Sequence, residues 1–211
     1  MNALPTDTPV VYLVDDDDAV REALALLLRS VGLRSSGYGD PLTFLDELPA
    51  HAIGCVVLDI RMPGISGLDV LARLAARSDL PVIMLTGHAN VDLCRRAFKG
   101  GAIEFLQKPM DDDVFLDAVQ SAVRGHVAGR ERAAVTEAAR ARLERLSGRE
   151  REVARRVAQG HANKEIAREF DLSPRTVETY RANVFVKLEV ASLAQLIRQY
   201  ALLLDGEAPA P

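Results

Sequence analysis

Residues 10–20 read VVYLVDDDDAV, in which five apolar residues are followed directly by four aspartates. An apolar run of this length is typical of a buried strand, and a break into Asp is typical of a helix start. The stretch therefore predicts a strand over 10–14 and a helix from about residue 18. It also raises a physical question, because adjacent carboxylates repel one another unless a cation or a helix N-terminus stabilises them.

The first half of the chain continues this alternation of short apolar runs and longer amphipathic stretches. Further strands are predicted at 33–38, 55–58, 82–85 and 102–106. Helices are predicted at 18–30, 41–48, 67–77, 90–99 and 112–126, the second of them with an Asp40 cap and Pro41 in its first turn. This alternation predicts a doubly wound α/β domain over 9–125, with functional residues beyond the carboxyl ends of its strands.

The composition indicates two domains with different partners. The chain has 211 residues, enough for two cores. Residues 1–125 hold 11 Lys and Arg against 18 Asp and Glu, a net charge of −7, whereas residues 126–211 hold 15 against 12, a net charge of +3. An acidic first half suits a divalent cation, and a mildly basic second half suits a polyanion such as DNA.

The sequence lacks the marks of several other protein classes. No window approaches the roughly 20 consecutive apolar residues of a membrane span, and Met1–Pro9 has neither the basic start nor the apolar run of a signal peptide. We therefore expect a cytoplasmic protein without a membrane partner. Cys55 and Cys94 lack the spacing of metal ligands, so we expect reduced thiols and neither a disulfide nor structural zinc.

The second half is predicted to be entirely helical. Residues 126–145 are rich in Ala, Arg and Glu and predict a helical linker that extends the preceding helix. Residues 146–204 predict four short helices, at about 149–159, 163–170, 174–188 and 192–204, with caps at Ser147 (boxed with Glu150), Asn163, Ser173 and Ser192 (boxed with Gln195). The tail, 205–211, is predicted to be disordered.

The four aspartates divide by position between the predicted strand and helix. Asp17 and Asp18 fall at the helix start, where they can cap free N–H groups and interact favourably with the helix dipole. Asp15 and Asp16 fall at the end of the strand, where two neighbouring carboxylates favour a cation between them. Hard oxygen ligands with room for water suit Mg²⁺.

Three more predicted strands end in polar residues at the same edge of the sheet, namely Asp59, Thr86 and Lys108. Any one of them can be an ordinary solvated loop residue, but four strand ends in agreement indicate a site. A carboxylate, a cation, a hydroxyl and an ammonium group together suit phosphoryl transfer, which depends on positioning and charge neutralisation.

Two families fit this chemistry and differ in the nucleophile. If Asp15 attacks and Asp17 is the acid, the aspartate run resembles the Asp-x-Asp motif of haloacid-dehalogenase-type phosphatases, with Thr86 and Lys108 as later motifs. That resemblance fails downstream, because Asp111 and Asp112 follow Lys108 by only three and four residues instead of ending a further strand. It also leaves Asp59 without a role.

The second family makes Asp59 the nucleophile. VDD at 14–16, LDIRMPGISG at 58–67, LTGHA at 85–89 and KGGAIEFLQKP at 99–109 resemble the receiver domain of two-component response regulators, a flavodoxin-like and CheY-like fold. The resemblance implies that Asp59 accepts a phosphoryl group from a phosphohistidine of a sensor histidine kinase.

The same resemblance implies roles for the surrounding residues. Asp16, Asp59 and the backbone carbonyl of Arg61 would ligate Mg²⁺, with Asp15 acting through water. Thr86 and Lys108 would bind the phosphoryl oxygens. It also implies that Phe105 is an aromatic switch, for which a plain core aromatic is the alternative. Met62, Pro63 and Gly64 are interpreted as a rigid loop that holds Asp59, and Arg61 and His88 would flank the phosphorylation site and influence hydrolysis of the acyl phosphate.

The third predicted helix of the second half has two distinct faces. Val177, Tyr180, Val184 and Leu188 recur at helical spacing and are expected to face the core. The opposite face is expected to carry Arg175, Glu178, Thr179, Ala182 and Asn183. Small and polar residues flanked by Arg and Lys suit base edges and phosphates, although an ordinary solvated face has the same pattern.

Residues 146–204, which contain LSGREREVARRVAQGHANKEIAREFDLSPRTVETYRANVFVKL, resemble the LuxR/NarL-type helix-turn-helix, and the whole chain resembles regulators of the FixJ class. The resemblance implies that 174–188 is the recognition helix. It places Glu178, Thr179 and Ala182 nearest the bases and Thr176, Arg181, Lys187, Asn163 and Lys164 near phosphates.

These observations predict a transcription factor activated by phosphorylation. Its expected partners are a sensor histidine kinase, double-stranded DNA and a second copy of the chain in a phosphorylated homodimer, with RNA polymerase as a further candidate. It is not expected to be an enzyme beyond slow autodephosphorylation. The alternatives are the phosphatase, a regulator that acts through protein contacts without DNA, and a DNA binder independent of phosphorylation.

Overall fold

The computed structural model describes residues 8–205. The predictions made for Met1–Pro9 and for the tail, 205–211, therefore lie mostly outside the described residues; Asp205, which was predicted to belong to the disordered tail, is instead the last residue of a helix. The chain divides into two compact units between Arg130 and Glu131. No helix of the described part combines the length and the apolar content that crossing a membrane requires.

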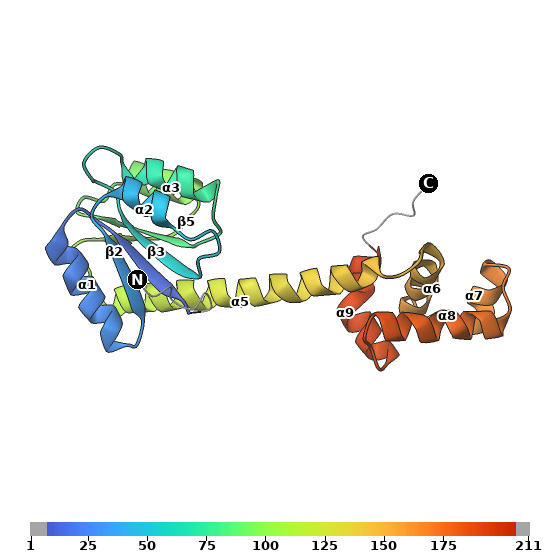
Figure 1. The fold of residues 1–211 in the computed structure, drawn as a ribbon. Helices are drawn as coiled ribbons and strands as arrows, with labels where there is room; N and C mark the ends of the chain where they lie inside the picture. The colour runs from blue at the N-terminus through green and yellow to red at the C-terminus, as the bar shows by residue number, and fades with distance from the viewer. Residues whose placement is uncertain (1–7, 206–211) are drawn as a thin grey trace. The chain divides into compact units, whose positions relative to one another are not determined.

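The first unit is built on a parallel sheet of five strands, β1 (Val10–Val14), β2 (Arg34–Tyr38), β3 (Gly54–Asp59), β4 (Val82–Thr86) and β5 (Ala102–Gln107). Their order is β2-β1-β3-β4-β5, and every neighbouring pair is parallel. The helices are α1 (Asp18–Ser30), α2 (Pro41–Glu47), α3 (Gly67–Ala75), α4 (Val91–Lys99) and α5 (Asp112–Glu144). Figure 1 shows helices on both faces of this sheet, which confirms the predicted doubly wound α/β fold.

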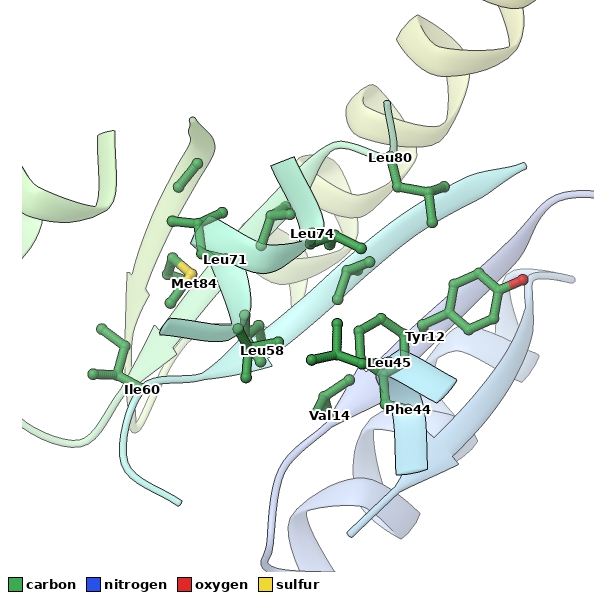
Figure 2. Close-up of a cluster of buried hydrophobic side chains, with 14 of the residues drawn as sticks. Tyr12, Val14, Phe44, Leu45, Leu58, Ile60, Leu71, Leu74, Leu80 and Met84 are labelled. Carbon is green, nitrogen blue, oxygen red and sulfur yellow. The ribbon is translucent and has the colours of Figure 1, made fainter. Parts of the chain in front are cut away.

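Alternating side chains of the strands build a separate core on each face of the sheet. Tyr12 and Val14 of β1 pack with residues of α2, α3 and α4, whereas Val11 and Leu13 pack with residues of α1 and α5. In Figure 2, Tyr12 lies beside Phe44, and their ring centroids are 6.0 Å apart. Strands buried on both faces in this way require the nearly continuous apolar runs seen in the sequence.

The strand order reverses between β1 and β3, because the chain crosses first to β2 on one side and then to β3 on the other. In a doubly wound sheet, the crevice at such a switch point lies outside the carboxyl ends of the strands and is where ligands bind. Asp15 and Asp59 stand at the ends of these two strands.

The second unit contains the C-terminal part of α5 and four further helices, α6 (Gly148–Ala158), α7 (Asn163–Glu169), α8 (Pro174–Lys187) and α9 (Leu193–Asp205). Their buried apolar residues form one core, in which the fully buried Tyr200 donates a hydrogen bond to the Leu188 carbonyl at 2.9 Å. The capping box of Ser147 and Glu150 at the start of α6 and the Ser173 cap of α8 confirm those predicted helix starts.

Candidate functional site

Four polar side chains meet where β1, β3, β4 and β5 end. Asp15 follows β1, Asp59 ends β3, Thr86 ends β4, and Lys108 follows β5. The side chains of Asp15, Asp59 and Thr86 are buried, and that of Lys108 is 23% exposed. The parallel sheet thus brings together four residues that are separated by as many as 93 positions in the sequence.

Lys108 links the two buried carboxylates. Its ammonium group donates a hydrogen bond to Asp59 Oδ1 at 2.7 Å and a second, very short one to Asp15 Oδ2. Burial alone lowers the pKa of Lys108, but the hydrogen bonds and negative charges of Asp15 and Asp59 outweigh burial and hold that pKa above its usual value of 10.5. The ammonium group is therefore charged near neutral pH and compensates two carboxylates.

The four aspartates of the opening stretch have separate environments. Asp15 is buried, and its Oδ1 accepts a hydrogen bond from the Asp17 amide at 3.1 Å. Asp16 is exposed. Asp17 caps α1 by accepting hydrogen bonds from the amides of Ala19 and Val20, and Asp18, the first helical residue, pairs with Arg21. The predicted helix-starting role of Asp17 and Asp18 is confirmed.

The loop after β3 orients the Asp59 carboxylate. Asp59 Oδ2 accepts a hydrogen bond from the Arg61 amide at 2.6 Å. Further along the loop, a Cβ atom on Gly67 would lie only 2.1 Å from the Asp59 carbonyl oxygen. Only glycine permits so close an approach to the backbone of Asp59. Gly67 ends the LDIRMPGISG stretch of the sequence, but nothing in that stretch indicated this contact with the Asp59 backbone.

The Thr86 side chain forms hydrogen bonds with the backbone of His88, on the loop that follows β4. Its hydroxyl group donates to the His88 carbonyl at 3.1 Å, and its oxygen lies 3.2 Å from the His88 amide. The Arg61 guanidinium group makes a short contact with His88 Nδ1. Arg61 and His88, which were predicted to flank the phosphorylation site, therefore contact each other. Phe105 is half-buried against the core that includes α3 and α4.

The residues at this edge have the chemistry of a magnesium site. The predicted donors are carboxylate oxygens and the Arg61 carbonyl, which are hard ligands of the kind that Mg²⁺ prefers. Asp15 and Asp59 already share one cationic partner, Lys108, so this pair is arranged around positive charge. Because Asp16 is exposed, its side chain is available to a solvated ion. The side chains of residues 8–205 include no cluster of three or more His, Cys, Asp or Glu that could hold a metal ion by itself.

In the second unit, α8 has the two faces that its sequence predicts. Val177, Val184 and Leu188 are buried, and Tyr180 packs against the same core while partly exposed. The opposite face is exposed along its length and carries Arg175, Glu178, Thr179, Ala182 and Asn183. Val186 is also exposed, with 76% of its surface accessible.

Several residues predicted to lie near phosphates also have partners within the protein. Lys187 donates to the buried carboxylate of Glu150 at 2.6 Å, and that hydrogen bond holds the pKa of Glu150 below its usual value. Arg181 donates to Asn163 Oδ1 at 2.7 Å. The Thr176 hydroxyl lies 2.8 Å from that of Ser173.

The prediction that Asn163 caps α7 is wrong. Asn163 is the first residue of the helix, and the cap position belongs to Ala162. Ala162 has no side-chain acceptor, but its amide donates to Glu165 Oε2 at 2.7 Å. Because the Asn163 side chain accepts from Arg181, it links α7 to α8 instead.

Comparison with known proteins matches both units. Residues 11–120 match the response regulator receiver domain family, and residues 144–200 match the luxR family of bacterial regulatory proteins. The transcriptional regulatory protein FixJ of Azorhizobium caulinodans is 46% identical over 98% of this chain and 97% of its own. The structure of response regulator StyR is 38% identical with a TM-score of 0.81, over 91% of this chain and 98% of its own. Full-length FixJ from B. japonicum is 42% identical with a TM-score of 0.58, over 95% and 98%.

This chain belongs to the two-component response regulators of the FixJ class. It has a receiver domain and a LuxR-type helix-turn-helix domain, and it functions in the regulation of transcription. The partners that these two domains imply are a histidine kinase and DNA. Membership of this family decides against the haloacid-dehalogenase-type phosphatase.

Arg21 is one residue of the site that the sequence reasoning missed. Its guanidinium group donates to the backbone carbonyl of Asp15 at 2.6 Å and also pairs with Asp18. The three-residue spacing between Asp18 and Arg21 signals an ion pair on a helix surface. That spacing carries no sign of the bond to Asp15, which depends on how the loop folds back.

Proposed function

We propose that Asp59 is the phosphoryl acceptor of this response regulator. A carboxylate oxygen of Asp59 forms a bond to phosphorus as the bond from phosphorus to the kinase histidine nitrogen breaks, and the released imidazole takes a proton from solvent. The observation that carries the proposal is the setting of Asp59, which is buried at the switch point and oriented by the Arg61 amide and Lys108.

Asp16, Asp59 and the Arg61 carbonyl hold Mg²⁺, and Asp15 contributes through water. When bound, the ion offsets the negative charge of the phosphoryl oxygens and of the carboxylates. Lys108 holds one phosphoryl oxygen through its charged ammonium group, because its Nζ atom already lies 2.7 Å from Asp59 Oδ1.

Thr86 and Phe105 transmit the modification. The Thr86 hydroxyl exchanges its bond with the His88 carbonyl for a bond with a phosphoryl oxygen, and Phe105, half-buried on the neighbouring strand, follows it. The surface of α4, β5 and α5 then mediates formation of a homodimer. Exposed large apolar side chains on these elements support this role, namely Val91, Phe98, Ile103 and Val114.

The helix-turn-helix domain binds double-stranded DNA through α8. Glu178, Thr179 and Ala182 are exposed and meet base edges, whereas Arg175 and Lys164, also exposed, meet phosphates. Four further residues contact phosphates while they keep their hydrogen bonds within the protein, namely Thr176, Arg181, Lys187 and Asn163. Lys187 reaches a phosphate only by sharing its ammonium group with Glu150.

We also propose limits for the domains and a location for the protein. The receiver domain spans 9–125, a helical linker 126–145 and the DNA-binding domain 146–204. The protein acts in the cytoplasm, where it has access to DNA and a kinase. Arg61 and His88, which contact each other, set the rate of a slow autodephosphorylation, and RNA polymerase is the further partner.

The acceptor is tested by incubating the full chain with a small phosphodonor and Mg²⁺ and measuring incorporated phosphate by intact mass. Asp59→Asn should abolish incorporation because the amide is a poor nucleophile. Asp46→Asn, a matched change on the exposed part of α2, should leave it unchanged. Undiminished labelling of the Asp59→Asn variant would exclude Asp59 as the acceptor.

A further inference from the structure

The Arg21 side chain lies largely buried beside the aspartates of residues 15–18, with 17% of its surface exposed. It projects from the first turns of α1 back towards the end of β1, where Nη1 donates to the Asp15 carbonyl oxygen at 2.6 Å. Its other terminal nitrogen pairs with Asp18. A guanidinium group can hold both partners at once because its donors point in fixed, divergent directions.

The hydrogen bond from Arg21 completes the attachment of Asp15. The Asp15 amide donates to the Tyr38 carbonyl of β2 at 3.2 Å, and the Asp15 carboxylate accepts from the Asp17 amide. The carbonyl oxygen is the remaining polar group, and Arg21 binds it. Since the peptide unit is planar, fixing the Asp15 carbonyl also fixes the nitrogen and Cα of Asp16.

One glycine on the neighbouring segment, Gly39, makes room for this arrangement. A Cβ atom on Gly39 would lie 3.3 Å from both terminal nitrogens of Arg21, which is closer than an ordinary contact, whereas one on Gly37 would be in ordinary van der Waals contact, 3.6 Å from the Arg21 Cδ atom. Gly39 does not have the positive φ that would itself demand glycine. The absence of a side chain at Gly39 therefore leaves room for the Arg21 guanidinium group.

We propose that Arg21 is a positioning residue for the magnesium site, acting through the Asp15–Asp16 peptide without touching metal or phosphate. The inference rests on the proposed function, in which Asp16 is a ligand. The charge of Arg21 and its hydrogen bond to Asp15 have opposite effects on the affinity for Mg²⁺. As a cation near a cation site, Arg21 weakens Mg²⁺ binding by Coulomb repulsion, so its removal would tighten binding if charge were its only effect. As the residue that orients Asp16, its removal weakens binding.

The test measures Mg²⁺ affinity of the full chain without phosphodonor, by isothermal titration calorimetry and by amide chemical shifts of the loop. Arg21→Gln and Arg21→Lys should each raise the Kd for Mg²⁺ by about tenfold or more, the size typical of lost partners behind a metal ligand. Arg21→Lys is informative because it keeps the charge but cannot bind Asp15 and Asp18 through the same planar fork. Arg29→Gln, on the exposed last turn of the same helix, is the control for loss of charge and should leave the Kd unchanged.

Gly39→Ala provides a second route to the same test if the Arg21 variants fold poorly. Its methyl group displaces the Arg21 guanidinium group by a few tenths of an ångström and should raise the Kd for Mg²⁺ in the same direction, by a smaller factor. Unchanged or tighter binding by Arg21→Gln, with wild-type affinity in Gly39→Ala, would overturn the proposal.

Measuring Mg²⁺ binding and phosphorylation separately distinguishes failure of the role of Arg21 from failure of the proposed function. If wild-type protein binds Mg²⁺ but takes no phosphoryl group at Asp59, the acceptor assignment fails while the role of Arg21 in metal binding stands. If wild-type protein binds no Mg²⁺, the metal site and the role of Arg21 are both contradicted. If wild-type and Arg21→Gln proteins bind Mg²⁺ equally and wild-type protein is phosphorylated, only the role of Arg21 is wrong.

Discussion

Removing the Lys108 ammonium group should destabilise the receiver domain when no metal is present. In Lys108→Ala, the buried carboxylates of Asp15 and Asp59 lose the cation that both of them contact. A hydrogen bond to a charged group contributes about 1.5 to 3 kcal/mol, and breaking a buried ion pair costs about 3 to 5 kcal/mol. Because the Lys108 side chain is 23% exposed, solvent screening favours the lower end, about 3 kcal/mol.

Hydrogen exchange measures this loss within one unit of a two-unit chain. Amides of β3 are protected by the receiver core, so a loss of about 3 kcal/mol should accelerate their exchange by about 150-fold at pH 7. Lys99→Ala, on the exposed end of α4, removes the same side chain without a buried partner and should leave exchange in β3 unchanged. Amides of α8, in the other unit, provide an internal reference in the same sample.

Addition of Mg²⁺ tests whether Asp15 and Asp59 are arranged to bind a cation. A divalent cation at the same edge compensates Asp15 and Asp59, so saturating Mg²⁺ should slow exchange in β3 more strongly in Lys108→Ala than in wild-type protein. Equal exchange in Lys108→Ala and Lys99→Ala would show that the two carboxylates do not depend on Lys108. Failure of Mg²⁺ to protect the variant would show that the carboxylates are not arranged for a cation.

Three further predictions follow from the site and from α8. Since the folded-state pKa of Lys108 is raised, its contribution to stability is full below the unfolded value of 10.5 and is lost as pH rises through the higher folded value; the difference in unfolding free energy between wild-type and Lys108→Ala proteins should persist at pH 9 and shrink only above about pH 10.5. Gly67→Ala should slow phosphorylation roughly tenfold to a hundredfold, because its methyl group displaces the Asp59 backbone, and a wild-type rate would contradict this. In anisotropy titrations of phosphorylated protein, Thr179→Ala should change preference among DNA sequences, whereas Lys164→Ala should weaken binding to all of them and lower the salt dependence; the same effect from both would refute the division into base and phosphate contacts.

The sequence predicted the crevice well because its signals are local. Each strand of the receiver is a short apolar run, and the first polar residue after it lies at the carboxyl edge by construction of a parallel sheet. The predicted strands agree with the observed ones to within one residue at each end, including the weakest, 33–38, observed as Arg34–Tyr38. Asp59 and Thr86 therefore lie where the runs indicated.

Hydrogen bonds between residues that are distant in the sequence could not be predicted from such local signals. Lys108 was predicted to bind a phosphoryl oxygen, and the structure adds its bonds to Asp15 and Asp59. Asn is a residue type that is common at helix caps, which is why Asn163 was predicted to cap α7. In the structure its side chain binds Arg181, 18 residues away, and Ala162 occupies the cap position. Local patterns report helix starts and burial, whereas the partner of a polar side chain depends on how whole elements pack.

The two cores on either face of the sheet also restrict where this chain can change its length. One residue inserted into β1 would exchange Tyr12 and Val14 with Val11 and Leu13 between the cores, and would exchange the buried Asp15 with the exposed Asp16 at the same time. A single insertion there would thus damage packing and chemistry together. Residues 49–51, in the segment between α2 and β3, are exposed and belong to neither core. Insertions and deletions acquired during evolution are therefore expected in segments of that kind, while the strand and its acidic end keep a constant count of residues.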